Sequence, residues 1–86
     1  MKYIIRLSNR AERDLDRLDR PTRKRVDRRL EQLAEDPFDP RLSAALTNQG
    51  ELRKSRVGGW RVIFKVEGTD VFVVTIERRG QVYQRI

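Results

Sequence analysis

The sequence predicts a small, single-domain α+β fold in which an N-terminal helix hairpin packs on an antiparallel-rich, twisted sheet, with the element order β-α-α-β-β-β. Two patterns carry this prediction. Between residues 11 and 34, apolar residues recur every three or four positions, as on one face of a helix. After Gly50 they recur at every second position, as in strands. The chain of 86 residues suits one domain, which we assign to residues 1–86.

A short strand followed by two helices is predicted for the N-terminal part of the chain. Alternating apolar side chains place the strand at residues 2–7. Ser8 is a good capping residue for the first helix. Pro21 suits the first turn of the second helix, and the Asp-Pro pair at residues 36–37 ends it. Such a helix hairpin can cover one face of a sheet and leave the other face open.

Three strands joined by tight turns are predicted for the C-terminal part. Two segments with turn-forming residues, at residues 58–59 and 67–70, make the strands a meander of two hairpins. The last strand is apolar at nearly every position, which predicts a central place in the sheet. The strands are expected at residues 52–57, 60–67 and 71–76, after a loop at 37–50 with a short helical turn at 43–46, and a basic tail follows at 77–86.

The composition excludes several kinds of chemistry. The chain contains neither Cys nor His, which excludes disulfides and the commonest zinc ligands and removes the usual general acid–base side chain. We therefore expect no metal and no cofactor, and any catalysis must rest on Lys, Arg, Tyr or carboxylates. The lack of Cys and of a long apolar run leads us to expect a cytoplasmic protein with no membrane partner.

Positive charge is concentrated in one short segment. The net charge is +7, and residues 53–65 contain five basic residues and no acidic one. This favours a polyanionic partner such as RNA, DNA or an acidic protein. Because side chains alternate along strands, Lys54 and Arg56 share a face, which Arg61 of the next strand can join. Basic residues and a tyrosine at residues 78–83 can close the end of this patch, which suits a phosphate backbone and a stacked base.

Four motifs, in the same order along the chain, resemble those of the RelE/ParE toxin superfamily. The most specific is Lys-Ser-Arg-Val-Gly-Gly-Trp-Arg-Val-Ile-Phe at residues 54–64, and a second is Arg-Gly-Gln-Val-Tyr at residues 79–83. The first helix contains Ala-Glu-Arg-Asp-Leu-Asp-Arg-Leu at residues 11–18, and the second ends in Leu-Ala-Glu-Asp-Pro at residues 33–37. The resemblance extends over the whole chain and includes the order of the elements.

The resemblance implies the toxin of a type II toxin–antitoxin system. Its RelE branch is a ribosome-dependent endoribonuclease that cuts messenger RNA in the A site, through attack of the ribose 2′-hydroxyl on the scissile phosphate. Lys54 and Arg56 match the basic pair that binds this phosphate and helps activate the hydroxyl. Arg61 matches the arginine that stabilises the charge of the transition state. Arg79 matches the arginine near the leaving 5′-oxygen and is the candidate proton donor or its electrostatic substitute. Tyr83 matches the tyrosine that orients or stacks a base.

Other positions add to this pattern or depart from it. We expect Arg53, Lys65 and Arg78 to contact RNA through their charge. Ser55 stands where the superfamily has an apolar core residue, so we expect loose strand pairing there. Trp60 replaces the usual tyrosine, and its alternation with apolar neighbours predicts a place in the core rather than stacking on a base.

The resemblance also implies partners and leaves alternatives open. An acidic, partly disordered antitoxin is expected to cover the basic surface. The ribosome and messenger RNA are the expected targets, and operator DNA is expected to be contacted only through the toxin–antitoxin complex. The same scaffold serves ParE-like toxins that inhibit DNA gyrase by binding. A non-catalytic partner that acts only in operon autoregulation is a third alternative.

Overall fold

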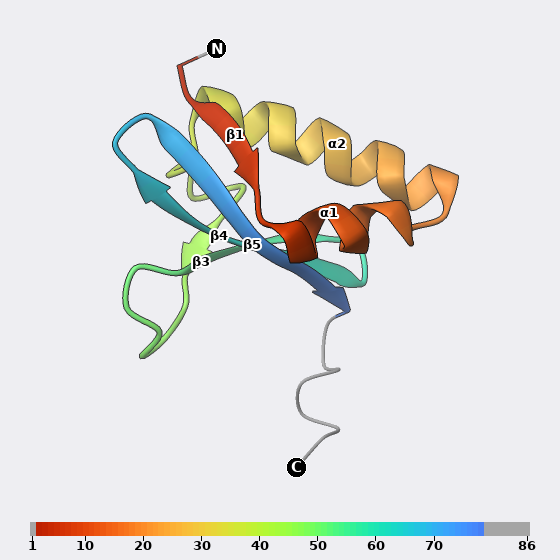
Figure 1. Ribbon diagram of the computed structural model, residues 1–86. Coiled ribbons are helices and arrows are strands. Elements are labelled where there is room, and N and C mark those ends of the chain that lie inside the picture. Colours follow the sequence, from red (N-terminus) through yellow and green to blue (C-terminus); the bar gives the residue numbers. More distant parts are fainter. Residues whose placement is uncertain (1, 79–86) are drawn as a thin grey trace.

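The predicted order of helices and strands is confirmed in a computed structural model, which describes residues 2–78 (Figure 1). One further strand, of two residues, lies within the predicted loop. The elements are β1 (Ile4–Leu7), α1 (Asn9–Asp16), α2 (Arg20–Glu35), β2 (Ala44–Ala45), β3 (Arg53–Val57), β4 (Trp60–Glu67) and β5 (Asp70–Arg78).

The strands form one five-stranded sheet in the order β1-β5-β4-β3-β2. Strands β3, β4 and β5 form the predicted antiparallel meander, and β5 has the predicted interior position. Strand β1, the first in the chain, pairs in parallel with β5, the last of the described strands. Helices α1 and α2 lie on the same side of the sheet, so its other face is left open (Figure 1).

Both helices begin at side chains that cap their first turn. The hydroxyl of Ser8 accepts a hydrogen bond from the backbone N–H of Ala11 at 2.9 Å, and Asp19 accepts one from Thr22 at 3.4 Å. These bonds satisfy N–H groups that a helix leaves unpaired at its start. Hydrogen bonding to Thr22 holds the pKa of Asp19 below its ordinary value. Neither helix in residues 2–78 has the length and apolar character needed to cross a membrane.

The core lies between the helix pair and the covered face of the sheet. Alternate strand residues point toward the helices, and each helix contributes one apolar stripe. Phe64 has the largest fully buried side chain, at 0% exposure, and Trp60 packs partly buried against the same cluster, as predicted. The buried cluster consists of Ala11, Leu15, Val26, Leu30, Leu33, Val57, Val62, Phe64, Val71, Val73 and Ile76.

Helix α1 also protects the edge of β5 beyond the end of β1. The hydroxyl of Ser8 donates to the backbone carbonyl of Val74 at 2.6 Å. The carboxylate of Asp14 accepts hydrogen bonds at 3.0 Å from the hydroxyl of Thr75 and from the backbone N–H of Ile76. Backbone groups that an edge strand would expose are therefore bonded to the helix, which blocks pairing with another chain at this place.

The prediction of a helical turn at residues 43–46 is wrong. Residues 44–45 instead form β2, which pairs with the first residues of β3. The hydroxyl of Ser43 donates to the carbonyl of Pro37 at 2.6 Å and so fixes the start of this strand. Alanine favours a helix intrinsically, but a single turn is too short to be stable alone. Pairing with β3 satisfies the backbone of this segment instead.

The prediction of loose pairing at Ser55 is also wrong. Ser55 lies opposite Val62 in the regular register of β3 and β4, and it is fully buried. Its hydroxyl accepts a hydrogen bond from Nη1 of Arg29, on α2, at 2.9 Å. A polar side chain is tolerated in the core when its hydrogen-bonding capacity is used. The serine therefore joins α2 to the sheet rather than weakening it.

Candidate nucleic-acid interface

The pairing of β3 with β4 places three predicted site residues on the open face. Arg56 lies directly opposite Arg61, and Lys54 lies two positions before Arg56 on the same strand. Residues opposite each other in an antiparallel pair project to the same side of the sheet. The intervening Ser55 and its partner Val62 are buried on the covered side. Lys54, Arg56 and Arg61 therefore share the face that the helices leave open, as predicted.

An irregularity in β5 brings an acidic residue to the same face. The register of β4 with β5 shifts between Ile63 and Phe64, which leaves Val74 as an extra residue without a partner in β4. Such a bulge changes the alternation of side chains beyond it. As a result Glu77 lies directly opposite Arg61 on the open face.

A hollow of about 490 Å³ lies beside this pair. It is bounded by β3, β4 and β5 and by the loop that precedes β3. Its charged lining residues are Lys54, Arg61 and Glu77, and Ile63 and Thr75 are among the uncharged ones. Across residues 2–78, the side chains do not assemble a group of three or more metal-ligating residues. The hollow thus combines two cations with one carboxylate.

Arg61 is held in place by Glu77. Nη2 of Arg61 donates to Oε1 of Glu77 at 2.6 Å, and the two side chains are only 15% and 18% exposed. A short charge-assisted hydrogen bond between poorly hydrated groups fixes the orientation of both. Nε of Arg61 is buried and has no hydrogen-bond partner within the described part of the chain. An unpaired buried donor is uncommon, so this guanidinium has bonding capacity that the described residues leave unused.

Lys54 and Arg56 differ from Arg61 because they have no counter-charge. The side chain of neither residue makes an ion pair or a hydrogen bond with residues 2–78. Lys54 is half-buried and Arg56 is exposed. Unpaired cations at such a place are free to donate charge-assisted hydrogen bonds to an anionic ligand.

Arg53 lies on the opposite side of the sheet from this group. It pairs with the buried Phe64 across β3 and β4. Its Nη2 donates to the hydroxyl of Ser43 at 3.0 Å, and its guanidinium lies 5.0 Å from the centre of the Phe38 ring. Arg53 therefore ties the loop before β2 to β3 from the covered side and is not part of the open-face group.

The other two predicted RNA-binding residues lie at the margins. Lys65 is on the open face, where its Nζ lies 3.4 Å from Glu67 and 5.8 Å from the ring of Phe72. Arg78 is exposed, and its guanidinium lies 5.7 Å from the ring of Trp60, its partner in the β4–β5 register. Neither residue lines the hollow.

Two predicted catalytic residues, Arg79 and Tyr83, lie outside the described residues. The structure adds others that the sequence did not indicate. Glu77 belongs to the segment that the sequence predicts as a basic tail, and none of its neighbours in the sequence marks it as the partner of Arg61. Arg29 comes from the middle of α2, where charges of both signs alternate.

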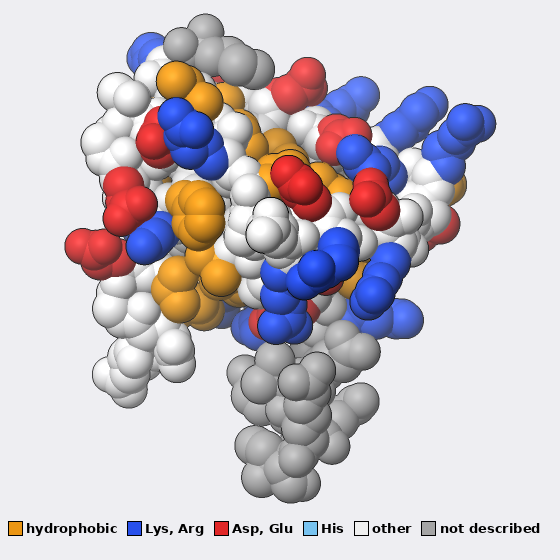
Figure 2. Space-filling view, viewed as in Figure 1, with side chains coloured by type: hydrophobic (Ala, Val, Ile, Leu, Met, Phe, Trp, Pro, Cys, Tyr) orange, Lys and Arg blue, Asp and Glu red, His pale blue; other side chains and the backbone are white. Residues whose placement is uncertain are grey.

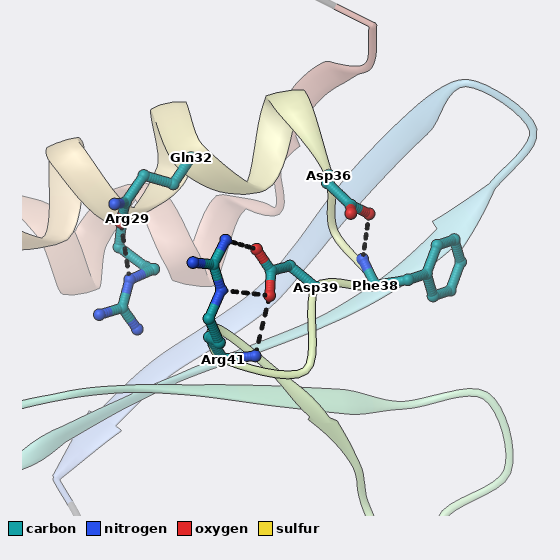
Figure 3. Close-up of polar contacts among 6 residues, drawn as sticks. All are labelled: Arg29, Gln32, Asp36, Phe38, Asp39 and Arg41. Atoms are coloured by element: carbon teal, nitrogen blue, oxygen red, sulfur yellow. Dashed lines mark hydrogen bonds and ion pairs between the residues drawn. The ribbon is translucent and has the colours of Figure 1, made fainter.

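A second pocket, of about 310 Å³, lies among α2, the loop before β2, and β3. Figure 3 shows Arg29 extending from α2 and Arg41 rising from the loop, where Asp39 binds it. Hydrogen bonds from Arg41 hold the pKa of Asp39 below its ordinary value, and the same contact raises the pKa of Arg41. The basic residues that line this pocket are Arg29, Arg41, Lys54 and Arg56.

The surface over the helices differs from the open face in its charge, because it carries basic and acidic side chains together. Figure 2 shows Lys and Arg side chains mixed with Asp and Glu over α1 and α2, whereas hydrophobic side chains reach the surface over the strands. Arg23, for example, lies 3.6 Å from Asp16 and 3.5 Å from Asp27. Mixed charges largely cancel at a distance. The unpaired cations of the open face are therefore the better candidates for binding a polyanion.

Comparison with protein families gives a match over most of the chain. The model of the ParE toxin of the type II toxin–antitoxin system parDE matches residues 5–83. The matched range includes every strand and helix from Ile5 onward, as well as Arg79 and Tyr83. Comparison with curated protein sequences gives no match.

Several solved structures share the fold. The toxin–antitoxin complex RelBE2 from Mycobacterium tuberculosis aligns with a TM-score of 0.80 at 22% identity, over 92% of this chain and 100% of that chain. The isolated RelE toxin of E. coli aligns at 0.78 and 21%, over 96% and 93%. The archaeal RelE–RelB complex from Pyrococcus horikoshii aligns at 0.77 and 22%, over 94% and 99%. These similarities establish a small α+β domain with two helices and a five-stranded mixed sheet.

Proposed function

This chain belongs to the ParE toxin family of type II toxin–antitoxin systems, and from its similarity in fold to RelE toxins we propose that it is a metal-independent endoribonuclease that cuts messenger RNA in the ribosomal A site. The observation that carries the proposal is the hollow on the open face, where Lys54 and Arg61 lie with Glu77 and where Arg56 lies opposite Arg61. Fixed cations around one hollow suit the phosphate of an RNA strand, and the carboxylate beside them suits proton transfer.

Binding of the scissile phosphate rests on the unpaired cations. Lys54 lines the hollow, and Arg56 lies on the same face opposite Arg61. Both donate hydrogen bonds to the oxygens of the scissile phosphate, because neither side chain has another partner in residues 2–78. Arg61, held by Glu77, already has its orientation when the substrate arrives. A donor that needs no rearrangement stabilises the charge of the transition state most effectively, and a single such donor contributes about 10²- to 10³-fold in rate.

Proton removal from the 2′-hydroxyl is assigned to Glu77. Lys54 would need to be deprotonated to act as a base, and the guanidinium of Arg56 stays protonated. Glu77 is the carboxylate that lines the hollow. It takes the proton while the 2′-oxygen forms a bond to phosphorus and the bond from phosphorus to the 5′-oxygen breaks. The products are a 2′,3′-cyclic phosphate and a strand that begins with a 5′-hydroxyl.

Contacts with the leaving group and with a nucleobase are assigned to residues 79–83. Arg79 is assigned to stabilise the charge on the departing 5′-oxygen, which receives through water the proton that Glu77 accepted, and Tyr83 is assigned to stack on or orient a nucleobase. Both roles follow from the match of residues 79–83 to the superfamily motif. Arg53, Lys65 and Arg78 do not line the hollow, and we propose that they attract RNA through their charge without contacting it there.

An antitoxin is the proposed protein partner. The relatives from M. tuberculosis and P. horikoshii were solved as complexes of toxin with antitoxin. A chain with a net charge of +7 and unpaired cations on one face favours an acidic, partly disordered partner that covers that face. Operator DNA is then contacted only through the complex, and the ribosome and its messenger RNA, in the cytoplasm, are the targets.

Primer extension on messenger RNA after expression of the toxin tests this function. We expect transcripts broken within codons, and we expect Arg61→Ala and Arg79→Ala each to abolish toxicity. Both variants should still fold and still bind the antitoxin, as measured by circular dichroism and co-purification. Arrested growth with unbroken transcripts would contradict the nuclease proposal, and toxicity retained by both variants would contradict the site.

A second candidate function is inhibition of DNA gyrase by binding. The match of residues 5–83 to the ParE toxin model favours this candidate, because ParE-like toxins inhibit gyrase by binding. A supercoiling assay with purified protein and gyrase separates the two functions directly. Normal growth on expression without the antitoxin would instead indicate a non-catalytic partner in operon autoregulation.

A further inference from the structure

We propose that the pocket among α2, the loop before β2, and β3 is a second phosphate site, which holds a phosphodiester next to the scissile one on the same RNA strand. This inference rests on the proposed action on RNA and adds a subsite to it. The pocket has a volume of about 310 Å³ and is lined by four basic side chains, and its lining includes no acidic residue. Lys54 and Arg56 belong to β3, Arg29 to α2 and Arg41 to the loop.

Arg29 is held rigidly at one wall of this pocket. Its Nε donates to Gln32 at 3.0 Å (Figure 3), and its Nη1 donates to the hydroxyl of Ser55 at 2.9 Å and to the carbonyl of Arg56 at 2.6 Å. Nη2 takes part in none of these bonds. An arginine anchored through two of its nitrogens loses little further entropy when the third binds an anion.

Arg41 forms another wall and is oriented by a neighbouring carboxylate. Asp39 binds Nε at 3.2 Å and Nη2 at 2.9 Å, which leaves Nη1 free of these contacts (Figure 3). Asp39 does not line the pocket itself. It therefore directs Arg41 without placing a negative charge against the ligand, and it raises the pKa of Arg41, which stays charged.

Continuity with the hollow favours RNA as the occupant. Lys54 lines both the hollow and this pocket, so one strand can pass from Arg61 over Lys54 toward Arg29. The remaining lining includes Pro40, Leu42 and Ala44, whose apolar surface suits the sugar of a nucleotide. An acidic side chain of a protein partner would use the positive charge of the pocket but not its continuity with the hollow. An RNA strand uses both, because its successive phosphates can occupy the two places.

Nuclear magnetic resonance of the full chain tests the location. The probe is a 12-nucleotide RNA with 2′-O-methyl groups, which binds but cannot be cut because it lacks the attacking hydroxyl, at low salt. We expect the backbone amide signals of Leu42 and Ala44, which line the second pocket but not the hollow, to shift together with those of Ile63 and Thr75 in the hollow. Shifts at the hollow alone would overturn the second site and leave the proposed function standing. No shifts at either place would count against both.

Matched substitutions test the contribution of the pocket to affinity. Arg41→Gln is the main variant, because Arg41 is 86% exposed and its loss leaves the core intact. Arg28→Gln is its control, since Arg28 is an exposed cation next to Arg29 on α2 that does not line the pocket. We expect Arg41→Gln to weaken binding of the RNA about fivefold or more and to reduce the slope of log K against log salt by about 0.7. The control should do neither.

A conservative variant separates charge from geometry. Arg29→Lys keeps the charge but loses the anchored fork, so we expect weaker RNA binding at an unchanged salt slope. Equal affinities of Arg41→Gln and Arg28→Gln would overturn the proposal. So would a loss of affinity for the antitoxin, but not for RNA, in Arg41→Gln, because the pocket would then belong to the protein partner.

Discussion

The two faces of one sheet differ in how far their bonding capacity is used. On the covered face, apolar side chains are fully packed, and even the polar Ser55 has a partner in Arg29. On the open face, Lys54 and Arg56 have no counter-charge in residues 2–78, and Arg61 retains a buried donor without an acceptor. Since the same strands supply both faces, the difference shows that alternation can separate the residues that stabilise the fold from those that remain available to a ligand.

The largest expected effect comes from replacing one phenylalanine on each face. Phe64 is fully buried on the covered face, so Phe64→Ala is expected to lower the free energy of unfolding by about 3–5 kcal/mol. Phe72 is half-buried, so Phe72→Ala should cost about 1 kcal/mol. Urea denaturation measures both values. Equal losses would mean that the open face carries as much folding energy as the core.

The second largest expected effect comes from replacing the acidic residue of the open face, Glu77. Glu77→Gln is expected to slow the proposed cleavage on ribosomes about 10²-fold or more, because the carboxylate that we propose as the proton acceptor is lost from the hollow. RNA affinity should rise at the same time, since a negative charge beside the phosphate is removed. Single-turnover cleavage and fluorescence anisotropy measure the two quantities separately.

Glu67→Gln is the matched control for this change. It removes the same charge from the end of β4, where Glu67 contacts Lys65 and lies outside the hollow. Both cleavage and affinity should stay near wild type. An unchanged rate in Glu77→Gln would rule out its role as the base, and a parallel loss of rate and affinity would assign it to holding Arg61 alone. Partial recovery is expected in Glu77→Asp.

The smallest expected effect concerns the junction of α1 with the sheet. The hydroxyl of Ser8 both caps α1 and donates to the carbonyl of Val74, so Ser8→Ala removes two hydrogen bonds. We expect a loss of about 1–2 kcal/mol and a lower melting temperature, by roughly 4–8 °C per kcal/mol. Ser8→Thr keeps the hydroxyl and should restore most of the loss. Equal melting temperatures for wild type and Ser8→Ala would contradict the double role.

Most of the fold could be predicted because its information is local. Helical spacing, capping at Ser8 and the change to alternation after Gly50 each depend on a few neighbouring residues. The parallel pairing of β1 with β5 depends on residues far apart, and no local pattern indicates it. Strand β2 was missed because two alanines give no strand signal and acquire their structure only by pairing with β3.

The positions of the candidate site residues in the sheet could be predicted where side chains alternate regularly along a strand, and could not be predicted elsewhere. Alternation placed Lys54 and Arg61 on one face, but charge alone grouped Arg53 with them, although its position in β3 assigns it to the other face. Glu77 could not be placed, because the bulge at Val74 changes the alternation of β5 and cannot be located from the sequence. The pocket cations from α2 and the loop come together only in the folded chain.

The parallel pairing of the first and last described strands also bears on when the toxin becomes active. Ser8 and Val74, which bond to each other, are 66 residues apart in the chain. Synthesis releases β1 and the helices first, and their contacts with β5 form only after nearly all of the described chain has emerged. The hollow needs β3, β4 and β5 together. A partly synthesised chain therefore lacks the complete hollow, and with it the activity that we propose for this site.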